Sequence, residues 1–256
     1  MKMLRPALRA VVLSVLVLSA ASAVPCFGIT KDFNQTYPLQ PGGSFELQNV
    51  NGPVEVQGWE RNEVEIHAVK SAKQKEADLD RVSIEVSARS AAVSVVTRYP
   101  QNEGVEVAVE YTVHVPYGTR VEHIATVNGT LTVTGVEAVE DLHTVNGNID
   151  VFDGGGNVHA RTTNGNIRIE LAHIRSESGT TAETTNGSVL LAVPSNTQAN
   201  IEARSLNGSF FSELPLSLES SQRPREIHGK LGKGGVPIQL RTVNGGIRIV
   251  ALRSTV

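Results

Sequence analysis

The sequence predicts an all-β protein, a β-solenoid-like stack of short strands in which each coil is one copy of a repeated phrase. The phrase Thr-x-Asn-Gly recurs along the chain, and Asn128, Asn146 and Asn164 follow one another at intervals of 18 residues. A short fixed period is typical of stacked repeats. Apolar and polar residues alternate on both sides of each Asn-Gly, a pattern that indicates a strand, a turn and a second strand.

Equal positions of the copies hold the same kind of residue. Thr or Ser stands two places before each asparagine except the first, and the positions four before and three after are apolar. We therefore expect inward-facing asparagines and threonines that stack and bond from coil to coil, because a repeated inward polar group needs a partner one rung away. At each corner, glycine is expected to supply a positive φ. The structural repeat comprises Asn51, Asn128, Asn146, Asn164, Asn186, Asn207 and Asn244, with Gly52, Gly129, Gly147, Gly165, Gly187, Gly208 and Gly245.

An antiparallel meander or sandwich is the alternative architecture, with each Asn-Gly forming a type I′ hairpin turn. The solenoid is favoured because a hairpin does not require the same Thr before every turn. The later spacings are 22, 21 and 37 residues, and the last is long enough to contain a degenerate repeat or an inserted loop.

An export signal is expected over residues 1–28. Basic residues precede an apolar run from Val11 to Val24 that is too short to span a bilayer comfortably, and cleavage after Ala23 or after Gly28 fits the small residues there. An uncleaved anchor is the alternative. The single cysteine, Cys26, would be lipidated in a lipoprotein, but the preceding Val and Pro do not fit that signal. These features predict export to the periplasm, the outer surface or the medium, with no transmembrane span after signal removal.

The mature chain divides into two expected regions within one continuous domain, residues 29–256. Residues 29–120 are β-rich without the tight repeat and are expected to form an antiparallel cap, because the open end of a stack exposes strand edges. Residues 121–256 hold the Asn-Gly coils. A charged stretch over residues 70–80 indicates a loop or one or two helical turns.

The opening phrase from Val50 to Trp59, the repeated Thr-x-Asn-Gly-x-Ile-x-Val phrases and the closing segment from Gly234 to Ile249 resemble a bacterial family. That family is the domain of unknown function 4097, called a "putative adhesin" or β-strand repeat-containing protein. The resemblance covers about residues 40–250. It implies a β-solenoid-like extracytoplasmic domain, and it carries no established catalytic residues.

Candidate metal ligands and catalytic acids are few. His123, Asp141 and His159 would share one outward column if the coils stack, and such a column could bind a transition metal, although outward positions of a solenoid are commonly polar without function. No nucleophile motif or phosphate loop occurs, so neither catalytic residues nor cofactors are expected. The formal net charge of -3 gives no case for nucleic acid as a partner.

The function that these observations predict is an exported, non-enzymatic binding or structural module of the cell envelope. Its partner would be a surface protein or a glycan, docked on an outward column formed by Arg161, Glu183, Arg204 and Arg241. The alternative is a carbohydrate-active β-helix enzyme, a polysaccharide hydrolase or lyase, with acids drawn from Asp150, Asp153 and Glu170. The ligand, the coil handedness and the oligomeric state are not readable from the residues.

Overall fold

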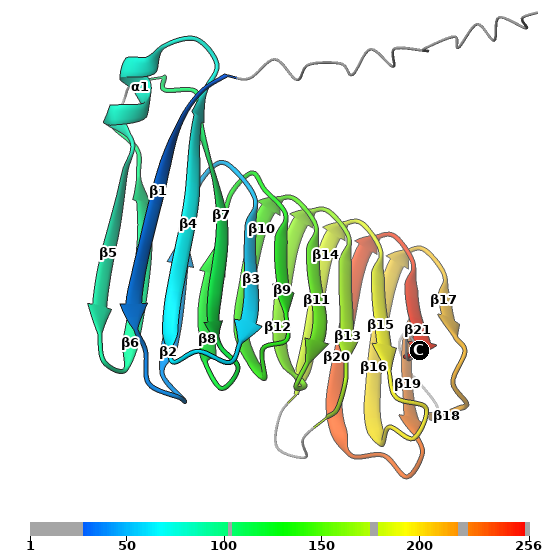
Figure 1. Cartoon of the computed structure of the whole chain (residues 1–256). Helices are drawn as coiled ribbons and strands as arrows, with labels where there is room; N and C mark the ends of the chain where they lie inside the picture. The colour runs from blue at the N-terminus through cyan, green and yellow to red at the C-terminus, as the bar shows by residue number, and fades with distance from the viewer. Residues whose placement is uncertain (1–27, 102–103, 175–178, 220–224, 254–256) are drawn as a thin grey trace, which may run out of the picture.

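The computed structural model describes residues 28–101, 104–174, 179–219 and 225–253. The expected export signal, including Ala23 and Cys26, lies outside these residues except for Gly28. The chain forms a long stack of strands with two broad faces, a ten-stranded and an eleven-stranded sheet (Figure 1). The prediction of an all-β, solenoid-like stack is confirmed.

The ten-stranded sheet faces the viewer in Figure 1. Its strands, in spatial order, are β1 (Ile29–Pro38), β4 (Glu63–Ala72), β7 (Val107–Pro116), β3 (Val54–Trp59), β9 (Leu131–Thr134), β11 (Ile149–Gly154), β13 (Ile167–Leu171), β15 (Val189–Val193), β21 (Ile247–Ala251) and β17 (Phe210–Ser212).

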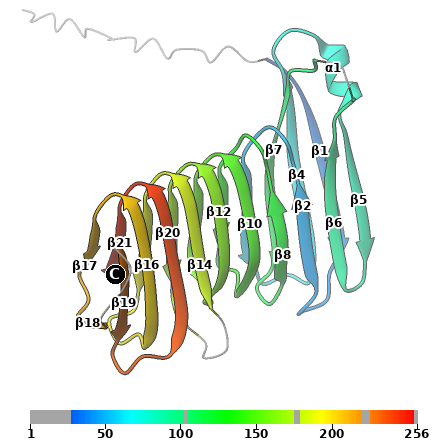
Figure 2. The same ribbon diagram turned by 180° about the vertical axis from the view of Figure 1, so that it is seen from behind.

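The eleven-stranded sheet forms the opposite face, seen in Figure 2. Its strands, in spatial order, are β18 (Leu216–Glu219), β19 (Glu226–Leu231), β16 (Ala199–Asn207), β20 (Val236–Asn244), β14 (Thr180–Asn186), β12 (Asn157–Asn164), β10 (Ala138–Asn146), β8 (Arg120–Ala125), β2 (Ser44–Gln48), β6 (Ala92–Arg98) and β5 (Ser83–Arg89). One short helix, α1 (Glu76–Arg81), follows β4.

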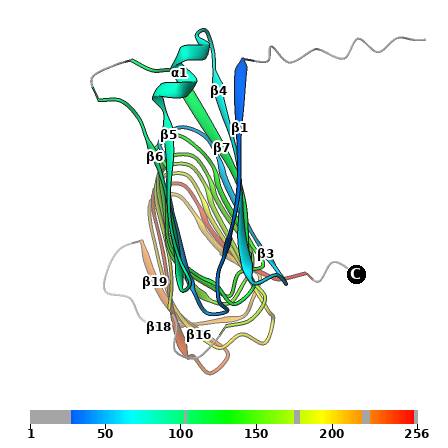
Figure 3. The ribbon, with the colours of Figure 1, turned by 60° about the vertical axis from the view of Figure 1, so that its left-hand side comes forward.

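Each regular coil contributes one strand to each sheet, and the Asn-Gly corner joins the two strands. Neighbouring coils pair in parallel, with Ile149 opposite Ile167 and Asn146 opposite Asn164. Seen from the N-terminal end, the coils lie one behind another (Figure 3). The meander alternative is therefore wrong, because a hairpin would place the two strands beside each other in one antiparallel sheet.

The last coil in the sequence is not the last coil in space. Strands β20 and β21 lie between the coil of β14 and β15 and the coil of β16 and β17, and they pair in parallel with both. The 37-residue spacing before Asn244 contains β18 and β19, which pair antiparallel at the outer side of β16. The chain therefore passes around β16 and returns to fill a position inside the stack.

Seven asparagine side chains form a continuous ladder along one edge of the stack. The ladder runs in the order Asn51, Asn128, Asn146, Asn164, Asn186, Asn244 and Asn207. From Asn128 on, each amide nitrogen donates to the amide oxygen of the preceding asparagine in this order at 2.8–2.9 Å. These side chains are exposed beyond Asn51, so the expectation that they face inward is wrong. In the coils from Asn146 on, the asparagine is the last residue of its strand, where the backbone turns between the sheets and directs the side chain along the edge.

The threonines of the phrase are the inward polar residues. Thr144 and Thr162 are buried, and their hydroxyls donate to the carbonyls of Gly129 and Gly147 at 3.0 and 2.9 Å. Each hydroxyl bonds to a carbonyl of the neighbouring coil, so equivalent hydrogen bonds recur from one coil to the next. They satisfy a polar group that would otherwise lie unpaired in an apolar interior.

The corner glycines share a close approach to the backbone of a neighbouring strand, whereas only some of them have a positive φ. Gly52, Gly187 and Gly245 have φ values of 121°, 159° and 158°, as turn chemistry predicts, but Gly129, Gly147, Gly165 and Gly208 are not among the glycines with positive φ. A Cβ atom at Gly147 would lie 1.9 Å from the carbonyl oxygen of Gly129 in the neighbouring coil. Backbone stacked on backbone therefore leaves no space for a side chain at the corner.

The core fills the space between the two sheets. The apolar positions before and after the corner are buried in successive coils, among them Ile124, Leu142 and Leu240 from one sheet and Leu131, Ile149 and Ile247 from the other. Every coil thus adds one layer to a single continuous apolar column, which is how a solenoid distributes its stability among neighbouring repeats.

The N-terminal end of the stack is built from longer strands. β1, β4 and β7 pair antiparallel, as do β5 and β6, whereas β2 and β3 pair in parallel with β8 and β9 and continue the coils. Helix α1 lies over this end, where the buried ammonium of Lys70 donates to the carbonyls of Leu79 and Val82 at 2.6 and 2.9 Å. No helix within the described ranges has both the length and the apolar character needed to cross a bilayer.

Candidate functional site

The four residues predicted as a partner face lie side by side on the outward face of the eleven-stranded sheet. Their strands β12, β14, β20 and β16 are consecutive (Figure 2), and the register places Arg161 opposite Glu183, Glu183 opposite Arg241, and Arg241 opposite Arg204. We call these four residues the arginine row. Their spatial order differs from the chain order because the last coil is inserted.

Ion pairs tie three members of the arginine row together. Arg161 donates to Glu183 through Nε at 3.0 Å and through Nη2 at 2.9 Å. Arg241 lies 3.6 Å from the other oxygen of Glu183 and donates to Glu202 at 2.8 Å. The hydrogen bond to Glu202 raises the pKa of Arg241 above its usual value. This part of the row is held in one geometry by charge-assisted contacts.

Arg204 at the end of the row is different. Within the described residues, no carboxylate lies within 4.0 Å of its guanidinium. Its strand β16 pairs on both sides, with β20 and with β19, so the backbone under it is fixed. The row therefore presents one guanidinium with free hydrogen-bonding capacity beside two that are already engaged.

A groove of about 340 Å³ runs along the row. Its second side is formed by the next outward residues toward the Asn-Gly edge, Thr163, Thr185, Val243 and Leu206. Thr163, Thr185 and Leu206 are exposed. The groove thus combines guanidinium donors on one side with hydroxyl groups and small apolar surfaces on the other.

A smaller hollow of about 270 Å³ adjoins the groove on the same face and includes Glu202, His228, Lys230 and Asn200. His228 lies 3.0 Å from a carboxylate oxygen of Glu226. Glu202 lines the hollow and accepts a hydrogen bond from Arg241, which lines the groove. The two depressions form one polar surface over β12 to β19.

The metal candidates are only partly brought together. His123 Nδ1 lies 2.7 Å from Asp141 Oδ2, whereas His159 pairs across its strand with Thr181. An irregularity in β10 between Val139 and Leu142 displaces Asp141 from the regular column. In the part of the chain that the structure describes, no group of three metal-binding side chains occurs.

Two of the three candidate acids of the enzyme alternative lie beside Arg168. Asp150 lies opposite Arg168 in the pairing of β11 with β13, and Arg168 donates to Glu170 at 2.8 Å. Burial raises the pKa of Asp150. Asp153 has a positive φ of 55° at the end of β11. Arg168 thus lies opposite Asp150 in the sheet and is hydrogen-bonded to Glu170.

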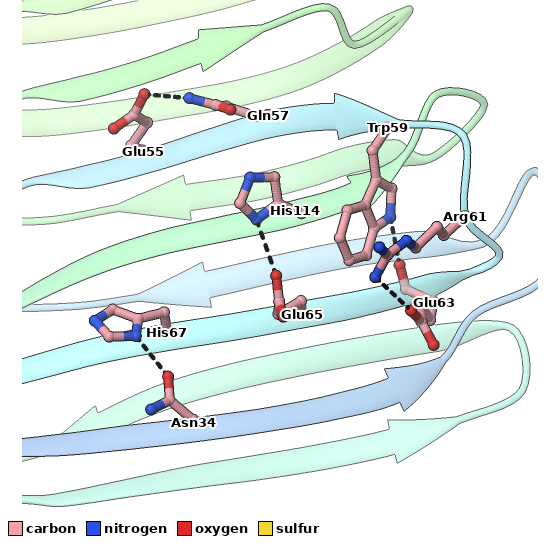
Figure 4. Close-up of polar contacts among 9 residues, drawn as sticks. All are labelled: Asn34, Glu55, Gln57, Trp59, Arg61, Glu63, Glu65, His67 and His114. Atoms are coloured by element: carbon pink, nitrogen blue, oxygen red, sulfur yellow. Dashed lines mark hydrogen bonds and ion pairs between the residues drawn. The ribbon is translucent and has the colours of Figure 1, made fainter.

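A second polar cluster, not identified as a site from the sequence, lies on the ten-stranded sheet over β1, β3, β4 and β7 (Figure 4). Its centre is Trp59, whose ring stacks on His114 with 5.0 Å between centroids and an interplanar angle of 22°. The Arg61 guanidinium lies 4.9 Å from the same indole. Trp59 is the only tryptophan of the chain, and this is the feature of the sequence that could have indicated the cluster.

Solved structures of other proteins resemble this chain. A putative cell adhesion protein from Clostridium sporogenes is similar in structure, with 12% sequence identity, a TM-score of 0.53 and coverage of 87% of this chain and 100% of that one. A putative adhesin from Bacteroides fragilis matches with 10% identity, a TM-score of 0.41 and coverage of 87% and 97%. No curated protein matches the sequence.

The family comparison is more specific than these distant structures. The profile of the DUF4097 family, described as Toastrack, matches residues 119–250, just over half of the 256-residue chain. The matched segment contains the regular coils, the inserted last coil and the whole arginine row. The chain belongs to the DUF4097, or Toastrack, family.

Proposed function

We propose that the protein is an exported, non-enzymatic binding module of the bacterial cell envelope, and that the groove along the arginine row holds its partner. Export is supported by the basic and apolar segments at the start of the sequence. A binding role is supported by a rigid, hollowed and charged face without a catalytic arrangement. The observation that carries the proposal is Arg204, a guanidinium on a fixed strand with no carboxylate partner among the described residues.

The chemistry of the groove favours a ligand that bears carboxylates. A guanidinium binds a carboxylate through two parallel hydrogen bonds, and such contacts are stronger than neutral ones. The threonine hydroxyls opposite can bond to neutral oxygens. Charged and hydroxyl groups repeat here at the spacing of neighbouring strands, about 4.8 Å. A periodic surface suits a periodic partner, and we therefore assign an acidic polysaccharide, such as a uronic-acid polymer, to this groove.

The test compares binding of polygalacturonate by the full chain and by two charge-reversal variants, using calorimetry. Arg204→Glu places a negative charge in the groove, and we expect a loss of affinity of about tenfold or more, in line with a lost charge-assisted hydrogen bond. Arg248→Glu makes the same charge change on the ten-stranded sheet, where Arg248 is exposed and lies over Phe211. This control should bind as the wild type does.

Salt provides an independent check. Binding that depends on exposed guanidinium groups should weaken steadily between low and physiological ionic strength, because the Debye length shortens. Equal affinities of Arg204→Glu and Arg248→Glu for polygalacturonate, or no binding by the wild type at low salt, would remove the arginine row as an acidic-glycan site.

A further inference from the structure

We propose that the Trp59 cluster on the opposite sheet is a second binding site, for a glycan of uncharged sugars. The cluster lies at the N-terminal end of the stack, on the face away from the arginine row, and its side chains come from four strands that the fold brings together (Figure 4). It is therefore distinct from the proposed acidic-glycan groove, and either site could fail without the other.

The first supporting feature is a fixed aromatic surface. The Trp59 Nε1 donates to the carbonyl oxygen of Glu63 at 2.8 Å, which holds the edge of the indole. The imidazole of His114 stacks on the indole and is in turn held by Glu65 at 3.4 Å, so the two rings are fixed as a unit. A partly exposed, immobilised aromatic plate can cover the apolar C–H face of a pyranose ring, since aromatic rings combine large contact area with defined geometry.

The second feature is a set of planar polar side chains beside that plate. Gln57, His114 and Glu65 occupy one outward row across β3, β7 and β4. The next row contains Glu55, which accepts from Gln57 at 2.6 Å, and the bonded pair of His67 and Asn34. Amide, imidazole and carboxylate groups offer both donors and acceptors, as hydroxyl-rich ligands require.

The third feature is the charge, which separates this site from the arginine row. Glu55, Glu63 and Glu65 contribute three negative charges and Arg61 one positive charge, so the cluster carries a net charge of -2 with neutral histidines. An acidic polysaccharide would be repelled here. The uncharged sugar is favoured because hydroxyl groups use the acceptors without requiring a counter-charge.

Arg61 is the movable part of the site. Its side chain is 67% exposed, and among the described residues its contacts are the indole face and a long contact of 3.5 Å to Glu63. Exposed pairs of this kind contribute little free energy. A sugar can therefore displace the guanidinium from Trp59 at small cost.

The experiment uses the single tryptophan as its own reporter. Because Trp59 is the only tryptophan, emission excited selectively at indole arises from this cluster alone. The full chain is titrated with neutral gluco-, xylo- and manno-hexasaccharides up to about 10 mM, well above the range of weak specific binding. We expect a saturable change in Trp59 emission with at least one of them, and protection of the indole from quenching by acrylamide.

Three variants decide whether the side chains act as assigned. Gln57→Ala and His114→Ala keep the reporter and should each weaken binding about tenfold, whereas Arg61→Ala should bind at least as well as the wild type. Arg204→Glu, on the other sheet, should leave the neutral-sugar titration unchanged. Thermal melting of each variant verifies that the fold is retained.

Several results would overturn the proposal. These are no saturable change with any neutral hexasaccharide, equal affinities of Gln57→Ala and the wild type, or tighter binding of a cationic glucosamine hexamer than of every neutral one. The last would show that Trp59 and the surrounding carboxylates form a cation site, which Arg61 occupies. A failure of the polygalacturonate assay would leave the neutral-sugar result unaffected, so the two proposals are tested separately.

Discussion

The corners of the regular coils leave no room for a side chain, whereas the N-terminal end of the same stack is filled with large ones. At the corners, glycine carbonyls lie where a Cβ atom of the next coil would be. Hydrogen bonds between asparagine side chains, and from threonine hydroxyls to glycine carbonyls, recur from coil to coil. At the N-terminal end, the largest fully buried side chains include Tyr111, Phe45 and Leu47. Close backbone stacking thus fixes the geometry of the coils, and side-chain volume closes the end.

This contrast predicts where the molecule tolerates change. A stack held together by close backbone contact should not tolerate substitution of a few small residues, but it should tolerate substitutions elsewhere on its faces. The filled end should behave like an ordinary core, with costs that scale with the volume removed. The permissive faces are the surfaces on which binding residues can vary, as the arginine row and the Trp59 cluster illustrate.

The largest effect is expected at a corner glycine. In Gly147→Ala the new methyl group would lie 1.9 Å from the carbonyl oxygen of Gly129, so two coils must separate. We expect a loss of about 4 kcal/mol or more in the free energy of unfolding, or failure to fold, because overlap with backbone cannot be relieved by a rotamer change. Chemical denaturation measures this change in the free energy of unfolding.

The matched control is Gly104→Ala at the N-terminal end. A Cβ atom there would meet nothing within 4 Å, so the change in unfolding free energy should stay within about 0.5 kcal/mol. A Gly147→Ala protein as stable as Gly104→Ala would show that the coils are not held at backbone contact.

The next effect is expected from a buried hydroxyl. Thr144→Val removes the donor to the Gly129 carbonyl and leaves that oxygen without this bond, at a cost of about 1–3 kcal/mol. Thr132→Val makes the same substitution at a half-buried outward position of β9 and should cost under about 0.5 kcal/mol. Equal unfolding free energies for the two variants would contradict the role assigned to the inward hydroxyls.

The architecture could be predicted from the sequence because the recurring phrase is itself the repeating unit. Thr-x-Asn-Gly between alternating apolar residues predicts stacked coils, and parallel pairing of equal positions confirms it. The side-chain directions at the corner could not be predicted in the same way. Asn146 shares the alternation of Leu142 and Thr144, which indicates an inward residue, but the chain turns at that residue and leaves the sheet plane.

Two further features depend on information that a repeat does not contain. The copies at Asn207 and Asn244 offer equivalent pairing to the copy at Asn186, so the phrase alone cannot determine which coil is inserted. The column containing Arg161 and Arg204 could be predicted because its members occupy the same repeat position. The Trp59 cluster could not, because its residues come from strands of mixed direction outside the repeat.

The asparagine ladder offers a test of the inserted coil. Asn244 donates to Asn186 and accepts from Asn207, whereas Asn207 at the end of the ladder makes only one such side-chain bond within the described residues. Asn244→Ala should therefore lower the unfolding free energy by about 1–2 kcal/mol and Asn207→Ala by about half of that. If the coils followed chain order, the two effects would be reversed, and denaturant unfolding of both variants distinguishes the cases.

The smallest effect concerns pH at the N-terminal end, where Lys70 and Lys31 respond in opposite directions. Burial lowers the pKa of Lys70 below its usual 10.5, so the unfolded chain binds more protons at pH values between the two pKa values, and stability rises with pH there. Asp80 raises the pKa of Lys31 through a hydrogen bond, so the contribution of Lys31 to stability is lost as pH rises through that raised value.

Lys70→Met should remove the rise in stability on approaching pH 10.5, whereas Lys31→Met should make the loss of stability above pH 10.5 smaller. Unfolding free energies measured across this range in the wild type and both variants check the signs, and a Lys70→Met protein with the wild-type slope would show that the ammonium under α1 is not desolvated.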